Sequence, residues 1–206
     1  FILYMILVIN NSRDLYKATM APKLLGILRS LDIEYIIIEK KKELKKIKKN
    51  YPNQEIKGII LTGGPLCISD NVYYKDIIKN ITAIQLFPNI PILGICFGFQ
   101  VLGDMYGGTI DKLHYHNLGF KKIDISNCDL ELFQELKKNK NNHTFFFSHN
   151  DQIKYIPPTF NYFIDNDIVI GIEHKDKKIF GVQFHPEGSG DGYEIIKTFI
   201  FKFCYN

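Results

Sequence analysis

The stretch PILGICFGFQ, residues 91–100, begins as an apolar run of strand length and ends in the first turn of a predicted helix. Cys96 lies between these two parts, with Gly94 two residues before it and Gly98 two residues after it. A sharp turn from strand to helix leaves little room for neighbouring side chains, and glycines at these positions suit it. A buried structural cysteine beside helix-packing glycines would give the same pattern. The stretch predicts a buried strand that turns abruptly into a helix at Cys96.

Before this stretch, short apolar runs alternate with segments of helical spacing. The expected strands lie at 5–10, 34–39, 57–64 and 91–95, and the expected helices at 13–31, 72–87 and 97–106. The opening run could be taken for a signal peptide, but it lacks a basic leader and a small-residue cleavage site, so we interpret it as a strand. Apolar strands that alternate with helices predict a parallel sheet with helical cover.

After Gly108 the expected elements become shorter and richer in β-forming residues. The expected strands lie at 109–115, 119–125, 143–148, 152–156, 161–165, 167–173 and 178–184. A short helix is expected at 129–136 and a closing amphipathic helix at 193–203. We therefore expect an open, mostly parallel α/β sheet with additional antiparallel strands. Because we find neither an internal repeat nor a flexible linker, residues 1–206 are expected to form a single domain.

The composition is typical of a soluble globular protein. Hydrophobic residues make up 46% of the 206 residues and charged residues 23%, and no apolar run approaches the length of a bilayer span. The formal net charge of +4 owes much to the lysine-rich segment 39–49, which has no aromatic residues interleaved with its lysines. We interpret this segment as a solvated face and expect neither a nucleic-acid nor a membrane partner.

The cysteines and histidines do not form a recognisable metal-binding pattern. The four cysteines are far apart and form no CxxC pair, which argues against a zinc knuckle and a disulfide scaffold and is consistent with the cytoplasm. The segment HYH, 114–116, could offer two imidazoles on one strand face, but no third ligand lies nearby in the sequence. We expect no metal site.

A cysteine nucleophile needs a base, and the segment FGVQFHPE, 180–187, offers one. His185 and Glu187 are two residues apart, so in an extended chain their side chains point the same way. The Glu187 carboxylate could then orient the imidazole and stabilise its charged form. A helix N-terminus and a nearby imidazolium both favour the thiolate of Cys96.

A reaction at a carbonyl carbon also needs donors for the oxyanion. The segment LTGGP, 61–65, follows a predicted strand and should bring backbone to the same edge of the sheet. The N–H groups of Gly64 and Phe97 are a plausible pair of donors. A plain turn would give the same TGGP pattern.

Four blocks of the chain together resemble the class I glutamine amidotransferases, the triad glutaminases, in order and spacing over nearly the whole length. The blocks are TGGP (62–65), GICFGFQ (94–100), SHND (148–151) and FGVQFHPE (180–187). The resemblance implies a flavodoxin-like α/β fold. It also implies that Cys96 is the nucleophile, that His185 is the base and then the acid, and that Glu187 orients His185.

The same resemblance assigns the groups that bind the substrate. It implies that Gly64 and Phe97 supply the oxyanion donors and that Gln100 contacts bound L-glutamine. The backbone at Asn150 and Asp151 would help to hold the α-carboxylate of the glutamine.

The implied activity is hydrolysis of glutamine to glutamate and ammonia for a separate synthetase chain. The sequence contains no SGGxDS-type ATP loop, so ATP and Mg²⁺ are expected only on that partner and no cofactor on this chain. TGGP and SHND are most similar to the GMP synthase branch, whereas the anthranilate and aminodeoxychorismate branches match less well. Gly188, Ser189 and Gly190 depart from the Val-x-His-Thr that usually follows HPE in the GMP synthase branch.

Two other functions are compatible with the same blocks. One is a free-standing γ-glutamyl peptidase or hydrolase that uses the same site on another substrate. The other is a degenerate domain that binds glutamine or a partner without turnover, which the intact Cys96, His185 and Glu187 disfavour.

Overall fold

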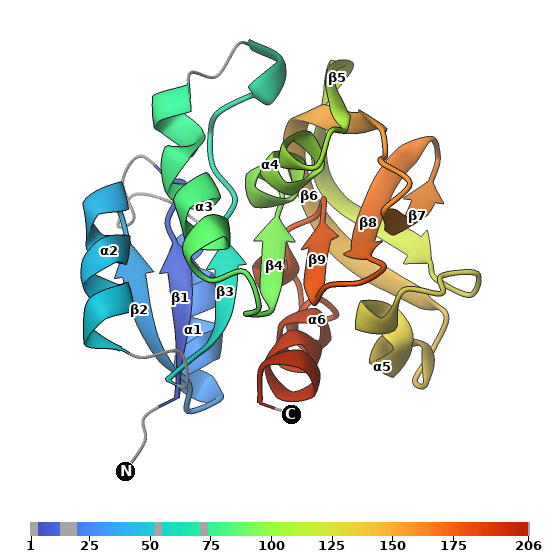
Figure 1. Ribbon diagram of the computed structural model, residues 1–206. Helices are drawn as coiled ribbons and strands as arrows, with labels where there is room; N and C mark the ends of the chain where they lie inside the picture. The colour runs from blue at the N-terminus through green and yellow to red at the C-terminus, as the bar shows by residue number, and fades with distance from the viewer. Residues whose placement is uncertain (1–3, 13–19, 52–54, 71–73, 206) are drawn as a thin grey trace.

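The computed structural model describes residues 4–12, 20–51, 55–70 and 74–205. Its main sheet has the strand order β2-β1-β3-β4-β9-β8-β7 (Figure 1). Five neighbouring strands are parallel: β2 (Glu34–Ile38), β1 (Met5–Ile9), β3 (Ile56–Leu61), β4 (Ile92–Ile95) and β9 (Ile179–Val182). Two more, β8 (Ile168–His174) and β7 (Phe160–Asp165), continue the sheet in antiparallel pairing. The predicted mostly parallel sheet with added antiparallel strands is confirmed.

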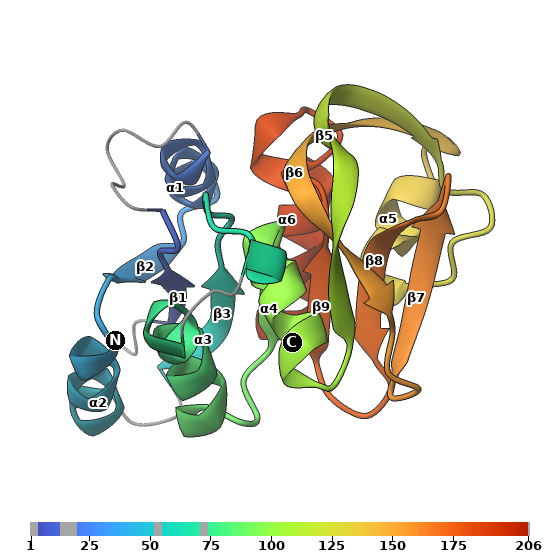
Figure 2. The same cartoon turned by 90° about the horizontal axis from the view of Figure 1, so that it is seen from above.

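Helices cover both faces of this sheet (Figure 2). One face carries α1 (Ala21–Ser30) and α6 (Tyr193–Thr198), and the other carries α2 (Lys41–Asn50), α3 (Tyr74–Leu86) and α4 (Phe97–Met105). Side chains alternate across a strand, so β1 contributes to both layers. Ile6 and Val8 belong to the core on the α1 side, whereas Leu7 and Ile9 belong to the core on the α2 side.

The helical segments follow the sequence with some corrections. The expected helix 13–31 begins at Ala21 in the described residues, and Pro22 lies in the first turn of α1, where a proline lacks only an N–H that has no intrahelical partner. The first part of the expected helix 13–31, up to residue 19, and the first two residues of 72–87 lie outside the described residues. The lysine-rich segment forms α2, with Leu44 buried and most lysines exposed. The closing helix α6 continues as a π-helical turn over Phe199–Cys204.

The main topological correction concerns the segments after Gly108. The expected strands 109–115 and 119–125 form one long strand, β5 (Thr109–Asp124), and 143–148 and 152–156 form another, β6 (Asn142–Tyr155). These two strands make a separate two-stranded ribbon instead of joining the main sheet. The expected break between the first pair is a bulge, where the β5 register shifts between Lys112 and Asn117 while pairing continues on both sides.

No helix in the described part of the chain is long and apolar enough to cross a membrane.

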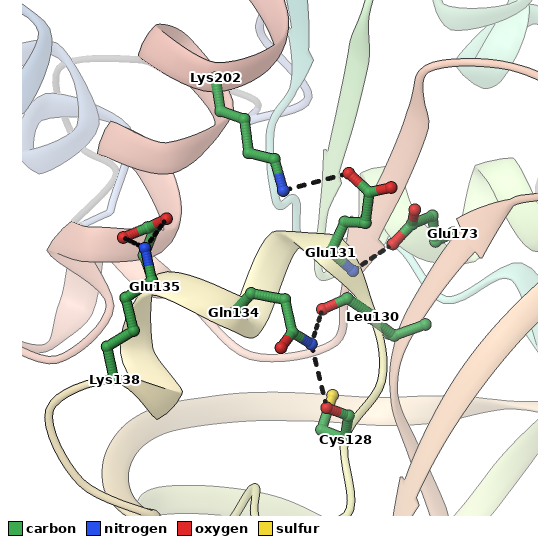
Figure 3. A network of polar contacts seen from close by, with 8 residues as sticks. All are labelled: Cys128, Leu130, Glu131, Gln134, Glu135, Lys138, Glu173 and Lys202. Carbon is green, nitrogen blue, oxygen red and sulfur yellow. Dashed lines mark hydrogen bonds and ion pairs between the residues drawn. The ribbon is translucent and has the colours of Figure 1, made fainter.

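A polar network joins β8, the C-terminal helix and the short helix α5 (Gln134–Lys137), which follows a 3₁₀ turn over Glu131–Phe133 (Figure 3). The Glu173 carboxylate accepts a hydrogen bond from the Glu131 N–H at 2.7 Å, and Lys202 lies 3.1 Å from the Glu131 carboxylate. The Gln134 amide donates to the carbonyl oxygens of Leu130 and Cys128. Burial raises the pKa of the Glu173 carboxyl, although the hydrogen bond from Glu131 opposes this shift.

The raised pKa of Glu173 predicts a pH-dependent stability. A carboxyl whose folded pKa exceeds its unfolded value of about 4.3 contributes stability below that pH and loses it as the pH rises through the folded pKa. Glu173→Gln keeps an acceptor for the Glu131 N–H and removes the charge. We therefore expect the unfolding free energy of the variant, relative to the unsubstituted chain, to increase between about pH 4 and pH 7 in urea titrations. Glu39→Gln, at an exposed position, is the control, and an equal trend in both variants would refute the explanation.

Candidate active site

Cys96 occupies a strained turn between β4 and α4. Its backbone has φ 50° and ψ −103°, a region that residues with side chains rarely adopt. The Cys96 N–H donates to the Val182 carbonyl at 2.9 Å, and the side chain is buried. This position at the carboxyl edge of the sheet and at the start of a helix is the one predicted from the sequence.

The glycines around Cys96 allow three elements to approach one another. A Cβ at Gly94 would lie 2.7 Å from the Gly98 carbonyl oxygen, and a Cβ at Gly98 would overlap the Leu61 carbonyl oxygen. Any side chain at these two positions would therefore push α4 away from β3 and β4. The close packing is what holds Cys96 in its strained conformation.

His185 and Glu187 follow β9 and lie beside Cys96. His185 Nδ1 is 2.9 Å from Glu187 Oε1, and both side chains are buried. Burial by itself lowers the pKa of His185, but the charges of Cys96 and Glu187 and the hydrogen bonds to both raise it well above 6.5. Because Nδ1 is engaged by Glu187, Nε2 is the ring nitrogen that remains for Cys96. The site thus favours an imidazolium next to the sulfur.

The TGGP loop packs directly against this pair. A Cβ at Gly63 would lie 2.6 Å from His185 Cε1 and 3.5 Å from Cys96 Cβ. The loop is held by Asn11, whose N–H donates to Thr62 Oγ1 at 2.9 Å and whose amide donates to the Thr62 carbonyl at 2.8 Å. Asn11 and Asn80 also exchange amide hydrogen bonds. The sequence analysis did not predict that Asn11 holds the TGGP loop. The only indication in the sequence was the pair of asparagines, Asn10 and Asn11, at the end of an apolar strand.

The two predicted oxyanion donors have N–H groups available. Phe97 is the first residue of α4, so its N–H has no intrahelical acceptor, and the helix begins its internal bonds with the Gln100 N–H to the Cys96 carbonyl at 3.0 Å. Neither the Phe97 N–H nor the Gly64 N–H donates to another residue in the described part of the chain. Both residues lie close to Cys96, because Phe97 follows it directly and Gly64 borders the same cavity.

A cavity of about 160 Å³ opens beside Cys96. Its size suits a small metabolite rather than a larger ligand. Its lining brings together residues that are far apart in the sequence, including the predicted residues Gly64, Cys96, Gln100, Asn150 and Asp151. Cys67, which the sequence analysis gave no role, is half-buried and also borders the cavity.

A buried polar network beneath the cavity holds Gln100 and Asp151. The Gln100 amide nitrogen donates to the Asp151 carbonyl at 3.0 Å and lies 3.2 Å from Gln183 Oε1. Its Oε1 accepts no hydrogen bond from another described residue and is therefore available to a ligand. The Asp151 carboxylate accepts hydrogen bonds from the N–H and hydroxyl of Ser69. Gln100 and the backbone of Asp151 are thus fixed relative to the cavity.

His149 completes this network as a neutral ring. Its Nδ1 lies 2.7 Å from the Asp151 carbonyl, which can only accept, so Nδ1 carries the proton. Nε2 then accepts from the Asn117 amide at 2.8 Å. Burial lowers the pKa of His149 to about 4. The SHND block pointed to this region, but only the folded chain assigns the supporting role to His149.

The backbone of strand β6 also contacts Cys96 and His185, the first through its sulfur and the second through its backbone N–H. The Ser148 carbonyl oxygen lies 3.6 Å from Cys96 Sγ and accepts a hydrogen bond from the sulfur when it is protonated. The Phe146 carbonyl accepts the His185 N–H at 2.7 Å. One strand therefore positions both members of the Cys96–His185 pair.

The arrangement suits nucleophilic attack on a carbonyl carbon. It combines a cysteine at a helix N-terminus, an imidazolium oriented by a carboxylate, and two backbone donors for an oxyanion. The described residues contain no group of three or more His, Cys, Asp or Glu side chains placed to hold a metal ion. His114 and His116 of the HYH segment are both exposed.

Residues 14–203 match the family model of the glutamine amidotransferase class-I family. A glutamine-hydrolyzing GMP synthase subunit from Methanococcus aeolicus is 38% identical over 183 residues, which cover 86% of this chain and 88% of that relative. A glutamine-hydrolyzing GMP synthase from Borrelia garinii subsp. bavariensis is 36% identical over 181 residues, which cover 86% of this chain but only 32% of that relative.

The fold also matches solved structures. A protein from Thermoplasma acidophilum, described as a candidate GMP synthase subunit, superimposes with a TM-score of 0.78 at 24% identity, covering 98% of this chain and 94% of that one. This likeness supports the fold described above.

The contact between Gly63 and His185 leads to a prediction. In Gly63→Ala the new methyl group must displace the ring, which cannot move without loosening its 2.9 Å contact with Glu187. The thiolate of Cys96 then loses its partner. We expect its alkylation by iodoacetamide at about pH 6 to slow roughly tenfold.

Mass spectrometry of the alkylated peptide would restrict the measurement to Cys96. Gly190→Ala is the matched control, because a Cβ at Gly190 meets nothing within 4 Å. Unchanged alkylation in Gly63→Ala would show that the ring position does not control the reactivity of Cys96.

Proposed function

Because the chain belongs to the class-I glutamine amidotransferase family, we propose that it hydrolyses L-glutamine and supplies the ammonia to a separate synthetase that converts XMP to GMP. The observation that carries this proposal is that Cys96, in its strained turn, contacts His185, which in turn contacts Glu187. In this proposal, residues 1–206 act as a single amidotransferase domain.

In the proposed mechanism the Cys96 thiolate attacks the side-chain amide carbon of glutamine. The N–H groups of Gly64 and Phe97 stabilise the oxyanion, and losing one such donor typically costs about 2.7–4 kcal/mol of transition-state stabilisation. His185 passes its proton to the departing ammonia, which leaves a γ-glutamyl thioester on Cys96. A water molecule, deprotonated by His185, then hydrolyses the thioester and releases glutamate. Glu187 keeps the ring oriented throughout.

The substrate occupies the cavity beside Cys96. Gln100 Oε1 accepts a hydrogen bond from the α-ammonium group of glutamine, and the backbone at Asn150 and Asp151 holds the α-carboxylate. The position of these residues around one cavity of about 160 Å³ supports this assignment.

The separate synthetase is supported by the Methanococcus aeolicus relative, which is named as a subunit of a GMP synthase. The chain spans 88% of the Methanococcus aeolicus relative but about a third of the Borrelia relatives. ATP and Mg²⁺ belong to the synthetase in this proposal, and the amidotransferase chain needs no cofactor of its own. The two chains work together in the cytoplasm, without a nucleic-acid or membrane partner.

The assignment of the nucleophile predicts the effect of Cys96→Ser. We expect glutamate release from glutamine to fall by at least about 10³-fold, since loss of a nucleophile in a catalytic triad removes most of the rate acceleration. Cys128→Ser is the matched control. The pKa of Cys128 is raised to about 11 by burial, which leaves it an inert thiol, and we expect its loss to preserve turnover. Retained hydrolysis in Cys96→Ser would remove the nucleophile assignment.

The proposed partner predicts a second result. Glutamine hydrolysis should rise at least about tenfold when an XMP-amidating synthetase chain is added with ATP, Mg²⁺ and XMP, because allosteric coupling energies of about 1–3 kcal/mol are common. GMP formation should then depend on glutamine. If no synthetase stimulates the chain while it cleaves γ-glutamyl peptides well, it is a free-standing hydrolase instead.

A further inference from the structure

Two large apolar side chains are exposed on β5 near the active site. Leu118 is 59% exposed and Phe120 is 64% exposed. The Phe120 ring contacts the ring of Phe146 on β6, with 5.1 Å between the centroids, and Phe146 is half-buried. We call Leu118, Phe120 and Phe146 the rim patch. Contiguous exposed apolar side chains of this kind often mark an interaction site.

The register of the ribbon connects the rim patch to the reacting groups. Leu118 pairs with Ser148, and Phe120 pairs with Phe146. Directly opposed residues of an antiparallel pair lie on the same side of the ribbon. Ser148 is the residue whose carbonyl oxygen lies 3.6 Å from Cys96 Sγ, and Phe146 is the one whose carbonyl accepts the backbone N–H of His185. The two exposed apolar residues are therefore the cross-strand partners of the two residues that position the nucleophile and the base.

The ribbon is suited to transmit a contact to these groups. In the described part of the chain the ribbon has two strands, and a single β-bridge links it to the segment that follows β9, between Phe146 and His185. Figure 2 shows the ribbon curving beside β8 and α4. A two-stranded ribbon gains rigidity when something packs on its face. A partner seated on the rim patch would hold the Ser148 and Phe146 carbonyls in place and so restrict the positions of Cys96 and His185.

The observations favour the synthetase as the partner that binds the rim patch. This assignment rests on the proposed function. In the Borrelia relative the matched region is 32% of a longer chain, so a similar amidotransferase unit is there joined to additional protein. Ammonia released in the cavity reaches an acceptor without loss to solvent only if the acceptor chain covers the mouth. Ser148 and His116 line that cavity, and Ser148 is paired with Leu118.

The charged residues around the rim patch indicate what kind of partner surface would fit it. Lys122 is exposed and lies two residues beyond Phe120, so it is on the same face of β5, and His114 and His116 are exposed on the adjoining bulge. We therefore propose that the synthetase docks on the rim patch through an apolar surface edged by carboxylates, and that this contact activates glutamine hydrolysis by fixing β6.

The test compares exposed apolar residues on two strands. Leu118→Ser and Phe120→Ser should keep basal glutamine hydrolysis within about threefold of the unsubstituted chain. In titrations with the XMP-amidating synthetase chain, ATP, Mg²⁺ and XMP, each should raise the apparent Kd at least about tenfold, as expected of an apolar anchor at an interface. Tyr162→Ser is the control, because Tyr162 is 54% exposed on β7, the edge strand of the main sheet, and is not part of the rim patch. It should bind and respond normally.

A third variant covers the case in which Phe120→Ser loosens the ribbon. Leu118→Glu leaves the ring contact between Phe120 and Phe146 intact and places a carboxylate against the expected acidic edge, so it should abolish stimulation while thermal unfolding stays unchanged. Normal stimulation of Leu118→Glu and Phe120→Ser by a synthetase that stimulates the unsubstituted chain would overturn the docking site alone. An unsubstituted chain that no synthetase stimulates would instead overturn the proposed function and, with it, this inference.

Discussion

The conformation of Cys96 is the constraint on which the rest of the structure depends. A residue with a side chain rarely combines φ 50° with ψ −103°, and the cost of such a backbone is of order 1–3 kcal/mol. Packing must therefore hold it in place. Gly94 and Gly98 let β3, β4 and α4 approach closely enough to do so, and the Cys96 N–H is held by β9. The strain directs the sulfur to the edge of the sheet, where the other reactive groups gather.

The parallel sheet explains why those groups meet. The carboxyl ends of parallel strands lie at one edge, so the loops after β3, β4 and β9 deliver the TGGP backbone, Cys96 and His185 to the same place. Each group then constrains the next. Gly63 leaves space for the His185 ring, Glu187 fixes the orientation of that ring, and the charges of Glu187 and Cys96 keep the buried imidazole protonated. A buried imidazolium would be costly without these partners.

The β5–β6 ribbon contributes a second kind of support. It supplies backbone carbonyls to Cys96 and His185 from one side, and it carries the neutral His149 that holds the Asp151 carbonyl beneath the cavity. The reactive pair thus lies between a rigid parallel sheet and a two-stranded ribbon. The ribbon is the part of the site that borders solvent with apolar side chains, and for this reason the positions of Cys96 and His185 can respond to a partner.

The sequence by itself determined the parallel core and the three residues that meet at its edge, because both follow from local patterns. Apolar runs of strand length alternate with helical spacing, and the GICFG turn and the HPE segment each end such a run. The tertiary structure alone decided that β5 and β6 leave the main sheet, that Asn11 holds the TGGP loop, and that Ser148 and Phe146 face Cys96 and His185. These contacts join residues about 40 to 50 positions apart or across a bulged register. Local periodicity cannot specify such pairs, because they depend on how the packed layers fit together.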